Sequence, residues 1–350
     1  MRLVQLVDFA AVTIAVALVS STLCGCQDNQ PDTTGRPQPL PAEVEQTAQT
    51  SVEPADSQPT PMAPQPGEFM DVVPPTRAPL EIDLSCVAVA EPPTVDGIAD
   101  DAAWREAPEV VTLDRSSQRE IRIRAVHTNE EIVLLAVWPD AAPSRTHRSW
   151  VWDAAEGVYK QGPDREDALV VKWSMDGNDA HLAIHDGNAR PHRADVWFWK
   201  ACRTDPAGYA DDKIDILTEE TEKGSCEIAK TDGGVLYLTR HGDAGEGAYK
   251  ERFVFDFAGA VSPRFEQHTP EGSRADVCAK GHWEGGYWTV EFRRRLQTGH
   301  DDDLAFAAGK TYLFGIACYE MACDVVHPEW TQPLYRTGDV FDRLLLVLTP

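Results

Sequence analysis

The sequence predicts an all-β fold, an antiparallel β-sandwich formed by residues 81–350. Short runs of alternating or wholly apolar residues recur along this part of the chain, and connections rich in Gly and Pro separate them. Apolar residues at helical spacing are scarce. Short strands that follow one another without intervening helices are typical of packed antiparallel sheets rather than of an α/β fold.

The elements can be assigned in chain order. Residues 102–106 are predicted to form a short helical turn that buries Trp104 at one end of the sandwich. Residues 120–126 alternate polar and apolar side chains, as a half-buried strand does, and the turn at 129–131 leads into a more buried return strand at 132–138. Further strands are predicted at residues 167–173, 197–201, 234–239, 287–292, 311–319 and 341–348.

The N-terminal part is predicted to export and tether the protein. Residues 1–26 resemble a bacterial lipoprotein signal peptide, because an uncharged apolar stretch shorter than a membrane span precedes Leu23-Cys24-Gly25-Cys26. Cys26 is the predicted lipidated residue; an ordinary cleaved signal peptide is the alternative. Residues 27–80 hold nearly half of the 25 prolines and only one aromatic residue, Phe69, so they are predicted to be a disordered tether. Both readings place the protein outside the cytoplasm.

The charge balance excludes one class of partner. The chain has 32 Lys and Arg against 57 Asp and Glu, a formal charge of −25. This excess of negative charge argues against nucleic acid and anionic membrane surfaces as binding partners. Arg293-Arg294-Arg295 is a rare basic run on an acidic domain, and we expect it at a solvated strand edge, with binding of an anionic group as the alternative.

One stretch, residues 180–212, concentrates residues that suit a flat cofactor. It contains His185 in a His-Asp-Gly turn and then an aromatic strand with Trp197 and Trp199. Aromatic strands of this kind sit deep inside a sandwich or between a core and a bulky planar ligand. The following segment, 205–212, is rich in turn formers and is predicted to be a loop.

The run DVWFWKACRTDPAGYADD, residues 195–212, resembles the haem-binding domain of the gamma subunits of ethylbenzene dehydrogenase and dimethylsulfide dehydrogenase, and related cytochrome c-552-like proteins. The pattern that begins at Val95 and ends at Trp104 resembles the start of family 9 carbohydrate-binding modules and their DOMON-like relatives. Together these resemblances imply a DOMON-like or jelly-roll-like sandwich over residues 84–350. They also imply a non-covalently bound haem b.

The resemblance implies candidate iron ligands. In the gamma subunits one ligand is a methionine in a Met-Gly turn before the Trp-x-Trp-Lys strand, and the other is a lysine near the C-terminus. The matching positions here carry His185 and, more loosely, His327. Imidazole is a competent iron ligand, and two histidines would leave no open coordination position, which favours electron transfer. Met175 and Met321 are the next candidates, although a buried methionine is more often packing.

Other residues are assigned supporting roles. Trp197 and Trp199 are predicted to be partly core, with one facing the cofactor pocket, and Lys200 is a candidate partner of a haem propionate or a solvated lysine at a strand end. The chain contains no Cys-x-x-Cys-His, so the usual covalent attachment of c-type haem is excluded. His181 and His192 compete with His185 as the ligand of this turn.

The leading interpretation is a lipid-anchored, extracytoplasmic haem protein with an electron-transfer role, a redox partner protein and no catalysis of its own. The alternative is a carbohydrate-binding or adhesion-type sandwich in which exposed tryptophans stack on sugars. A third reading is a structural surface lipoprotein that kept the fold and lost the ligand. The fold alone does not separate these functions.

Overall fold

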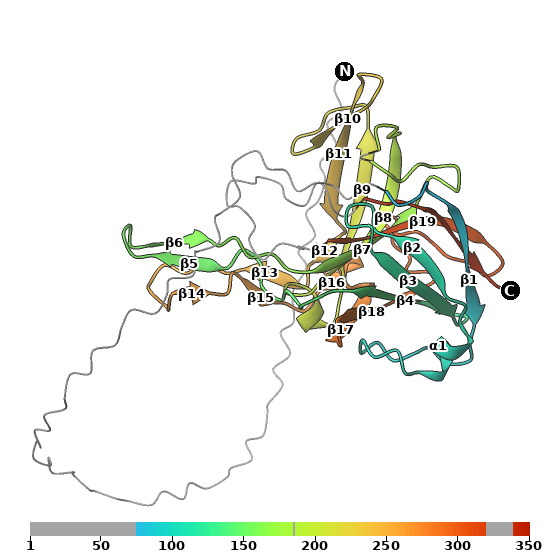
Figure 1. Ribbon diagram of the computed structural model, residues 1–350, viewed down its shortest axis with the longest axis horizontal. Helices are drawn as coiled ribbons and strands as arrows, with labels where there is room; N and C mark the ends of the chain where they lie inside the picture. Colours follow the sequence, from blue (N-terminus) through green and yellow to red (C-terminus); the bar gives the residue numbers. More distant parts are fainter. Residues whose placement is uncertain (1–74, 185, 320–338) are drawn as a thin grey trace, which may run out of the picture. The chain divides into compact units, whose positions relative to one another are not determined.

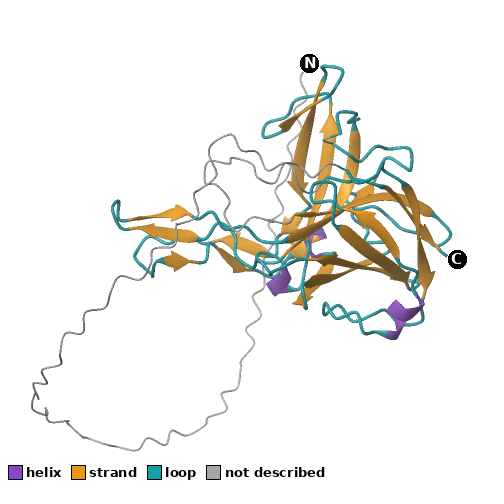
Figure 2. Cartoon of the chain, viewed as in Figure 1, coloured by secondary structure: helices purple, strands orange, loops and turns teal. Residues whose placement is uncertain are grey.

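The computed structural model describes residues 75–184, 186–319 and 339–350. These residues form an almost entirely β structure, with one short α-helix and two 3₁₀ turns (Figures 1 and 2). The helical elements are α1 (Ala102–Glu106), η1 (Asp205–Ala207) and η2 (Ser273–Ala275). None of the helices in the described residues has the length and apolar content that crossing a bilayer requires.

A sheet of 13 strands dominates the described chain, in the order β10-β11-β9-β8-β7-β19-β20-β1-β3-β4-β18-β17, with β2 paired to β3. Its strands are β1 (Glu81–Ala88), β2 (Val110–Leu113), β3 (Glu120–His127), β4 (Glu131–Pro139), β7 (Ala168–Ser174), β8 (His192–Lys200), β9 (Asp211–Thr218), β10 (Cys226–Ala229), β11 (Val235–Gly242), β17 (Cys278–Glu284), β18 (Tyr287–Arg295), β19 (Thr311–Tyr319) and β20 (Arg343–Leu348). Three smaller sheets contain β5 (Trp150–Asp153), β6 (Val158–Gln161), β12 (Gly245–Glu246), β13 (Tyr249–Glu251), β14 (Val261–Ser262), β15 (Phe265–Gln267) and β16 (Glu271–Gly272).

The large sheet folds back on itself, so that its two halves face each other as a sandwich. Trp199 of β8 packs edge-on against Trp138 of β4, with ring centroids 6.1 Å apart, and Trp197 lies 6.2 Å from Phe292 of β18. One continuous core cluster joins apolar side chains from both halves. The predicted β-sandwich is therefore confirmed.

One strand departs from the antiparallel prediction. β1 runs parallel to both of its neighbours, β20 and β3, whereas the other pairings of the large sheet are antiparallel. β1 lies between the C-terminal strand and the first hairpin, so that it joins the two halves. No local turn connects β1 to either neighbour, which is why alternation within the sequence carried no signal of its direction.

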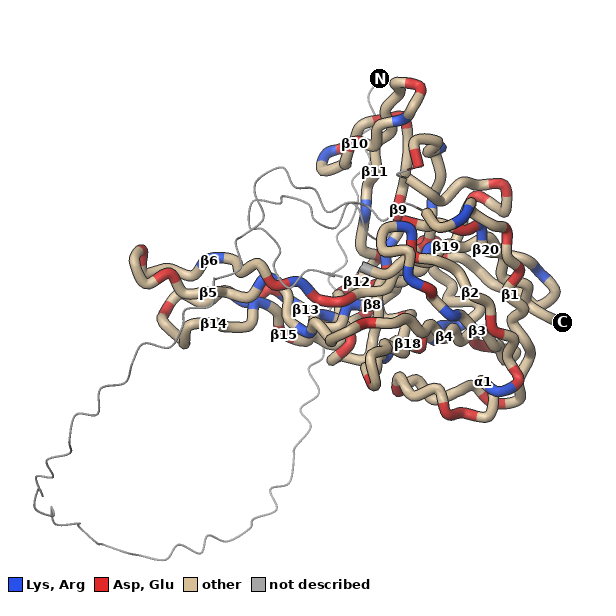
Figure 3. The backbone as a smooth tube through the Cα atoms, in the orientation of Figure 1, with Lys and Arg blue, Asp and Glu red and all other residues tan. Residues whose placement is uncertain are grey.

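The short helical turn and the burial of Trp104, both predicted from the sequence, are confirmed at the start of the domain. Helix α1 buries Trp104, which is 1% exposed and donates its Nε1–H to Glu291 Oε1 at 2.7 Å. This is the structural role predicted for that tryptophan. Arg77 lies within the segment predicted to be a tether, residues 27–80, but it pairs with the buried carboxylate of Asp342 at 2.6 Å, so the described end of that segment contacts the sandwich. Acidic and basic positions are interspersed along the described chain (Figure 3).

Candidate functional site

Strand β8, at the centre of the predicted site, presents its two faces to different surroundings. Because side chains alternate along a strand, Trp197 and Trp199 point between the two halves of the sandwich. Val196 and the half-buried Phe198 point to the opposite, outer face, where they pack with Val170 of β7. The site thus has an inner face and an outer face of different composition.

The inner face is filled by aromatic side chains. Trp197 lies 5.0 Å from Trp173 between ring centroids, and Trp199 lies 4.9 Å from Trp288. Both tryptophans are fully buried at 0% exposure. In the described part of the chain they belong to the packed core, whereas the sequence predicted that one of them would face a cofactor pocket.

A carboxylate behind the strand fixes the position of Trp199. Asp205 of η1 accepts hydrogen bonds from Trp199 Nε1 at 2.9 Å and from the backbone N–H of Gly281 at 2.6 Å. Lys280 Nζ donates to the same carboxylate at 3.0 Å. Residues 205–212 were predicted to form a loop. Through Asp205 this segment links β8 to β17 by hydrogen bonds, and its last two residues already belong to strand β9.

Lys200 is buried on the outer face, in contrast to the solvated lysine that was one of its two sequence interpretations. Its Nζ lies 2.5 Å from the carboxylate of Asp211, which Lys213 also reaches at 3.1 Å and to which Arg274 donates. Burial lowers the pKa of Lys200 to about 8, and the neighbouring Asp211 opposes this shift. Three cationic groups thus surround one carboxylate, which leaves local positive charge on an acidic domain.

Three of the four candidate iron ligands are not among the residues that the structure describes. His185, His327 and Met321 lie outside the described residues, as does the predicted lipidation site Cys26. Met175 is described: it follows β7, is half-buried, and its backbone N–H donates to Arg193 O at 3.0 Å.

The described residues that flank the candidate ligands meet on the outer face. Ile184 precedes His185, and its backbone N–H donates to Asp339 Oδ1 at 3.0 Å. Asp339 is the first described residue after the segment that contains His327. Leu182 and Val340 pack in one cluster with outward side chains of β7, β8 and β19.

A buried acidic group on the inner side was not predicted. Asp195, Asp212, Asp243 and Asp303 are each at most 8% exposed, and Arg294 is the cation bonded within the group, at 2.5 Å from Asp195 and 2.9 Å from Asp303. Burial raises the pKa of Asp243 to about 8 and that of Asp303 to about 6, and it also raises the pKa of Asp195 and Asp212.

The position of Arg294 corrects the expectation that the Arg293-Arg294-Arg295 run forms a solvated edge, since Arg294 is 1% exposed. The available signal was the alternation itself: with Phe292 in the core, the side chain two residues later must point the same way. Apart from Asp303, nine residues away, the acidic partners lie far from Arg294 in the chain, so no comparable local pattern pointed to them.

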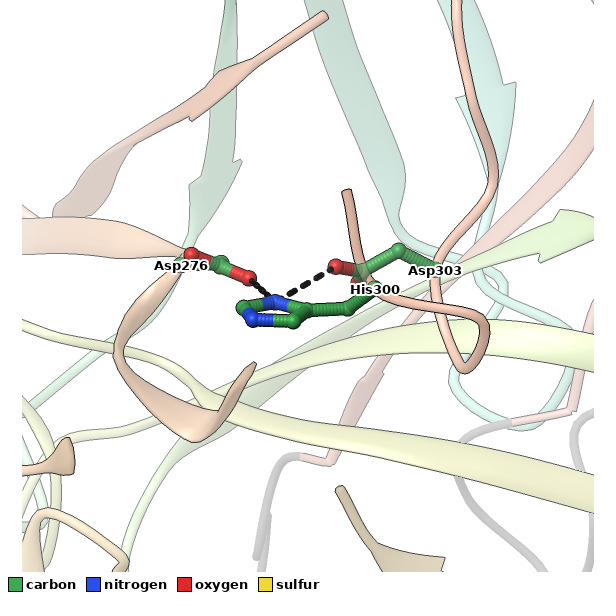
Figure 4. Close-up of side chains that lie close together, drawn as sticks. All are labelled: Asp276, His300 and Asp303. Carbon is green, nitrogen blue, oxygen red and sulfur yellow. Dashed lines mark hydrogen bonds and ion pairs between the residues drawn. The ribbon is translucent and has the colours of Figure 1, made fainter. Parts of the chain in front are cut away.

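The acidic group continues toward the surface through a histidine. His300, 41% exposed, directs Nδ1 toward Asp276 Oδ2 at 2.6 Å and toward Asp303 Oδ2 at 3.8 Å (Figure 4). The hydrogen bond to Asp276 is the main cause of the raised pKa of His300. Asp303 therefore belongs both to the buried group and to a triad with Asp276 and the exposed His300.

Two solved structures to which this chain is similar are described as a carbohydrate-binding module and a putative carbohydrate-binding protein. A family 9 carbohydrate-binding module from Caldicellulosiruptor kristjanssonii, solved with cellotriose, is 10% identical with a TM-score of 0.35, over 77% of this chain and 95% of that one. A putative carbohydrate-binding protein from Bacteroides uniformis is 10% identical with a TM-score of 0.36. The match covers 77% of this chain and 100% of that one. No curated protein matches the chain.

A family model described as ethylbenzene dehydrogenase matches residues 87–324, which is more than half of the chain. The matched region includes the aromatic strand β8 and the segment that follows it, which carry the resemblance to this family. The resemblance inferred from those residues is confirmed. The chain belongs to the ethylbenzene dehydrogenase family.

Proposed function

We propose that this protein is an extracytoplasmic, lipid-anchored haem-binding protein that transfers electrons and has no catalytic activity of its own. The observation that carries the proposal is the match to the ethylbenzene dehydrogenase family across the segment with the candidate ligand turn and the aromatic strand. Haem held non-covalently there would supply one-electron redox chemistry.

The flanking contacts support a site on the outer face of β7, β8 and β19. The hydrogen bond between Ile184 and Asp339 brings together the two points where the candidate ligand segments join the described fold. Beneath them lies an apolar cluster in which Val170 and Val196 are buried against Leu182 and Val340, and the half-buried Phe198 is its accessible apolar surface on β8. A planar apolar cofactor needs such a surface, and the aromatic core on the inner side is already filled by its own side chains.

The charges on this face also suit a haem. Haem carries two propionate groups, which basic side chains bind in an otherwise acidic protein. Lys200, Lys213 and Arg274 surround the single carboxylate of Asp211 next to Phe198, and Lys200 Nζ lies 4.5 Å from the Phe198 ring centroid. This positive edge would hold the propionates, with His185 and His327 as the proposed axial ligands.

The anchor and the partner complete the proposal. Lipidation of Cys26 would hold the domain at a membrane, and an electron-transfer protein needs a redox partner protein to donate or receive the electron. Because the domain carries excess negative charge, a basic docking surface on that partner is favoured.

The test is the visible spectrum of the full chain purified from a haem-replete host. We expect a low-spin spectrum with sharp α and β bands on reduction, and haem that leaves in acidified organic solvent. His185→Ala is expected to abolish this spectrum or to convert it to high-spin. His282→Ala, which removes a half-exposed histidine on β17, is the matched control and should leave the spectrum unchanged.

Two results would contradict the proposal in different ways. A folded protein that takes up no haem on reconstitution would exclude the haem function and favour the carbohydrate-binding alternative. That alternative has few exposed tryptophans in the described residues, where six are fully buried and only Trp150, Trp152 and Trp283 are partly exposed. Low-spin haem that survives His327→Ala would instead assign the second ligand to Met321 or Met175.

A further inference from the structure

The buried acidic group carries more negative charge than its arginine can neutralise. Arg294 donates to Asp195 Oδ2 and to Asp303 Oδ1, so it uses one oxygen of each carboxylate. The second oxygen of each, Asp195 Oδ1 and Asp303 Oδ2, is buried and accepts no hydrogen bond of ordinary length, although Trp197 adjoins Asp195 and His300 Nδ1 lies 3.8 Å from Asp303 Oδ2. Four carboxylates therefore face one guanidinium in a region shielded from water.

Two further carboxyl groups have no hydrogen-bond donor apart from each other. Asp212 of β9 is 0% exposed, Asp243 is 5% exposed, and their side chains lie within hydrogen-bond reach of one another, while no other donor among the described residues reaches their oxygens. The backbone holds them together, since the N–H of Asp243 donates to the carbonyl of Asp212 at 3.2 Å. A buried carboxylate with no partner is strongly destabilising, so a chain that places two of them side by side implies something that binds them.

The spacing of the oxygens indicates what that partner is. One oxygen from each of Asp195, Asp212 and Asp303 lies within 4.8 Å of the others. Ligand oxygens around Ca²⁺ sit at about 2.3–2.6 Å from the ion, so oxygens on opposite sides of it are separated by up to twice that length. From this convergence of buried carboxylate oxygens, we propose that Asp195, Asp212 and Asp303, together with Asp243 beside Asp212, bind a divalent cation, and specifically Ca²⁺.

The chemistry of the site favours Ca²⁺ over softer metals. All of the donors are carboxylate oxygens, which suit hard cations, and Ca²⁺ tolerates the irregular geometry and high ligand number that four aspartates supply. Zinc prefers nitrogen and sulfur ligands, and none is within the buried group. A divalent ion would reduce the net charge of the four carboxylates and Arg294 from −3 to −1.

The bound ion would join parts of the sandwich that are distant in sequence. Asp195 and Asp212 lie on β8 and β9, Asp243 directly follows β11, and Asp303 lies in the connection between β18 and β19. The exposed His300, paired with the half-buried Asp276, lies between Asp303 and the solvent (Figure 4). The ion would therefore stabilise the fold next to Trp197, independently of any haem.

The test uses the full chain, stripped of metal with EDTA and dialysed free of chelator. Isothermal titration with CaCl₂ at pH 7.5 should show one site, with a Kd in the range of about 10⁻⁴–10⁻³ M that extracellular calcium modules have. Saturating Ca²⁺ should raise the melting temperature by at least about 2 °C, whereas equal ionic strength of NaCl should not.

Asp212→Asn is the diagnostic variant, because it keeps the shape of the side chain and removes one charge. We expect at least tenfold weaker Ca²⁺ binding, together with an unchanged or higher melting temperature in EDTA. Asp232→Asn is the matched control: this exposed aspartate accepts a hydrogen bond from Gly234 N at 2.9 Å that asparagine can retain, and Ca²⁺ binding should be unchanged. Should Asp212→Asn fail to fold, Asp243→Asn replaces it.

Two other outcomes would overturn the proposed Ca²⁺ site. A wild-type chain that neither binds Ca²⁺ nor gains stability from it would mean that the carboxyl groups are simply protonated in the folded state. Wild-type binding that Asp212→Asn and Asp243→Asn both retain would place the ion elsewhere. Since haem uptake is measured by its spectrum, failure here would leave the proposed haem function untouched.

Discussion

The substitution Gly281→Ala tests whether Trp199 belongs to the rigid core. Gly281 of β17 lies against the Trp199 ring, and a Cβ built on it would fall 2.3 Å from Trp199 Cζ2. Carbon atoms in contact prefer about 3.5–4.0 Å, so the ring or strand β17 must move by more than an ångström. The neighbours resist this movement, because Asp205 holds both Trp199 Nε1 and the N–H of Gly281.

The expected cost follows from that overlap. Overpacking a well-filled core destabilises proteins by about 1–3 kcal/mol. For a domain of this size we expect the melting temperature to fall by roughly 2–6 °C. Differential scanning calorimetry of the variant and of the wild-type protein would measure the change.

The control is Gly234→Ala in the exposed turn between β10 and β11. Its new Cβ would meet only the Asp232 carboxylate at 3.0 Å and the flexible end of Lys230 at 3.5 Å, so little change is expected. If Gly281→Ala were as stable as this control, Trp199 would have space to move. The assignment of Trp199 to the packed core, and of any cofactor to the opposite face, would then be refuted.

Three further predictions concern the charges buried in the described fold. Arg294→Met should lower the free energy of unfolding in metal-free buffer by about 3–5 kcal/mol, because it leaves Asp195 and Asp303 buried without their cation. A loss of less than about 1 kcal/mol in urea unfolding would contradict this expectation. Burial raises the pKa of Glu291 from 4.5 to about 7, so the folded state binds more protons than the unfolded one between these values. Stability should therefore fall as pH rises from about 4.5 to 7, and Glu291→Gln should flatten this slope in urea unfolding series; an unchanged slope would refute the assignment. Limited proteolysis should leave a core that still contains Arg77, because Arg77 and the backbone of Leu80 both bind Asp342; a stable core that begins at residue 81 or later would show that these contacts are dispensable.

The strands were the most predictable part of the fold. The strand predicted at residues 311–319 matches β19, and the hairpin predicted from 120–126 and 132–138 matches β3 and β4 within one residue at each end. Alternation of polar and apolar side chains is a local property, so it can be read without knowledge of the partner strand. The parallel direction of β1 is not local, since its partners β20 and β3 are set by the fold as a whole.

The candidate site shows the same division. The aromatic composition of β8 identified the family, because that resemblance depends on residues that are adjacent in sequence. Which face each side chain occupies depends on what packs against it. Asp195 and Arg294 are 99 residues apart and were not associated with each other, although they form a buried ion pair at 2.5 Å.

The contents of the two faces of β8 restrict where a cofactor can bind. On the inner face, Trp197 and Trp199 are packed among other aromatic side chains. The acidic group around Arg294 lies next to Trp197 on the same face. A haem there would have to displace a core and bring its propionates toward carboxylates, both of which are unfavourable. On the outer face, Phe198 lies beside Lys200, and the contact of Ile184 with Asp339 joins the two segments that carry His185 and His327. If these histidines bind the iron, the tryptophans that first drew attention to this strand support the site from behind, and Phe198 is the residue of β8 that contacts the cofactor.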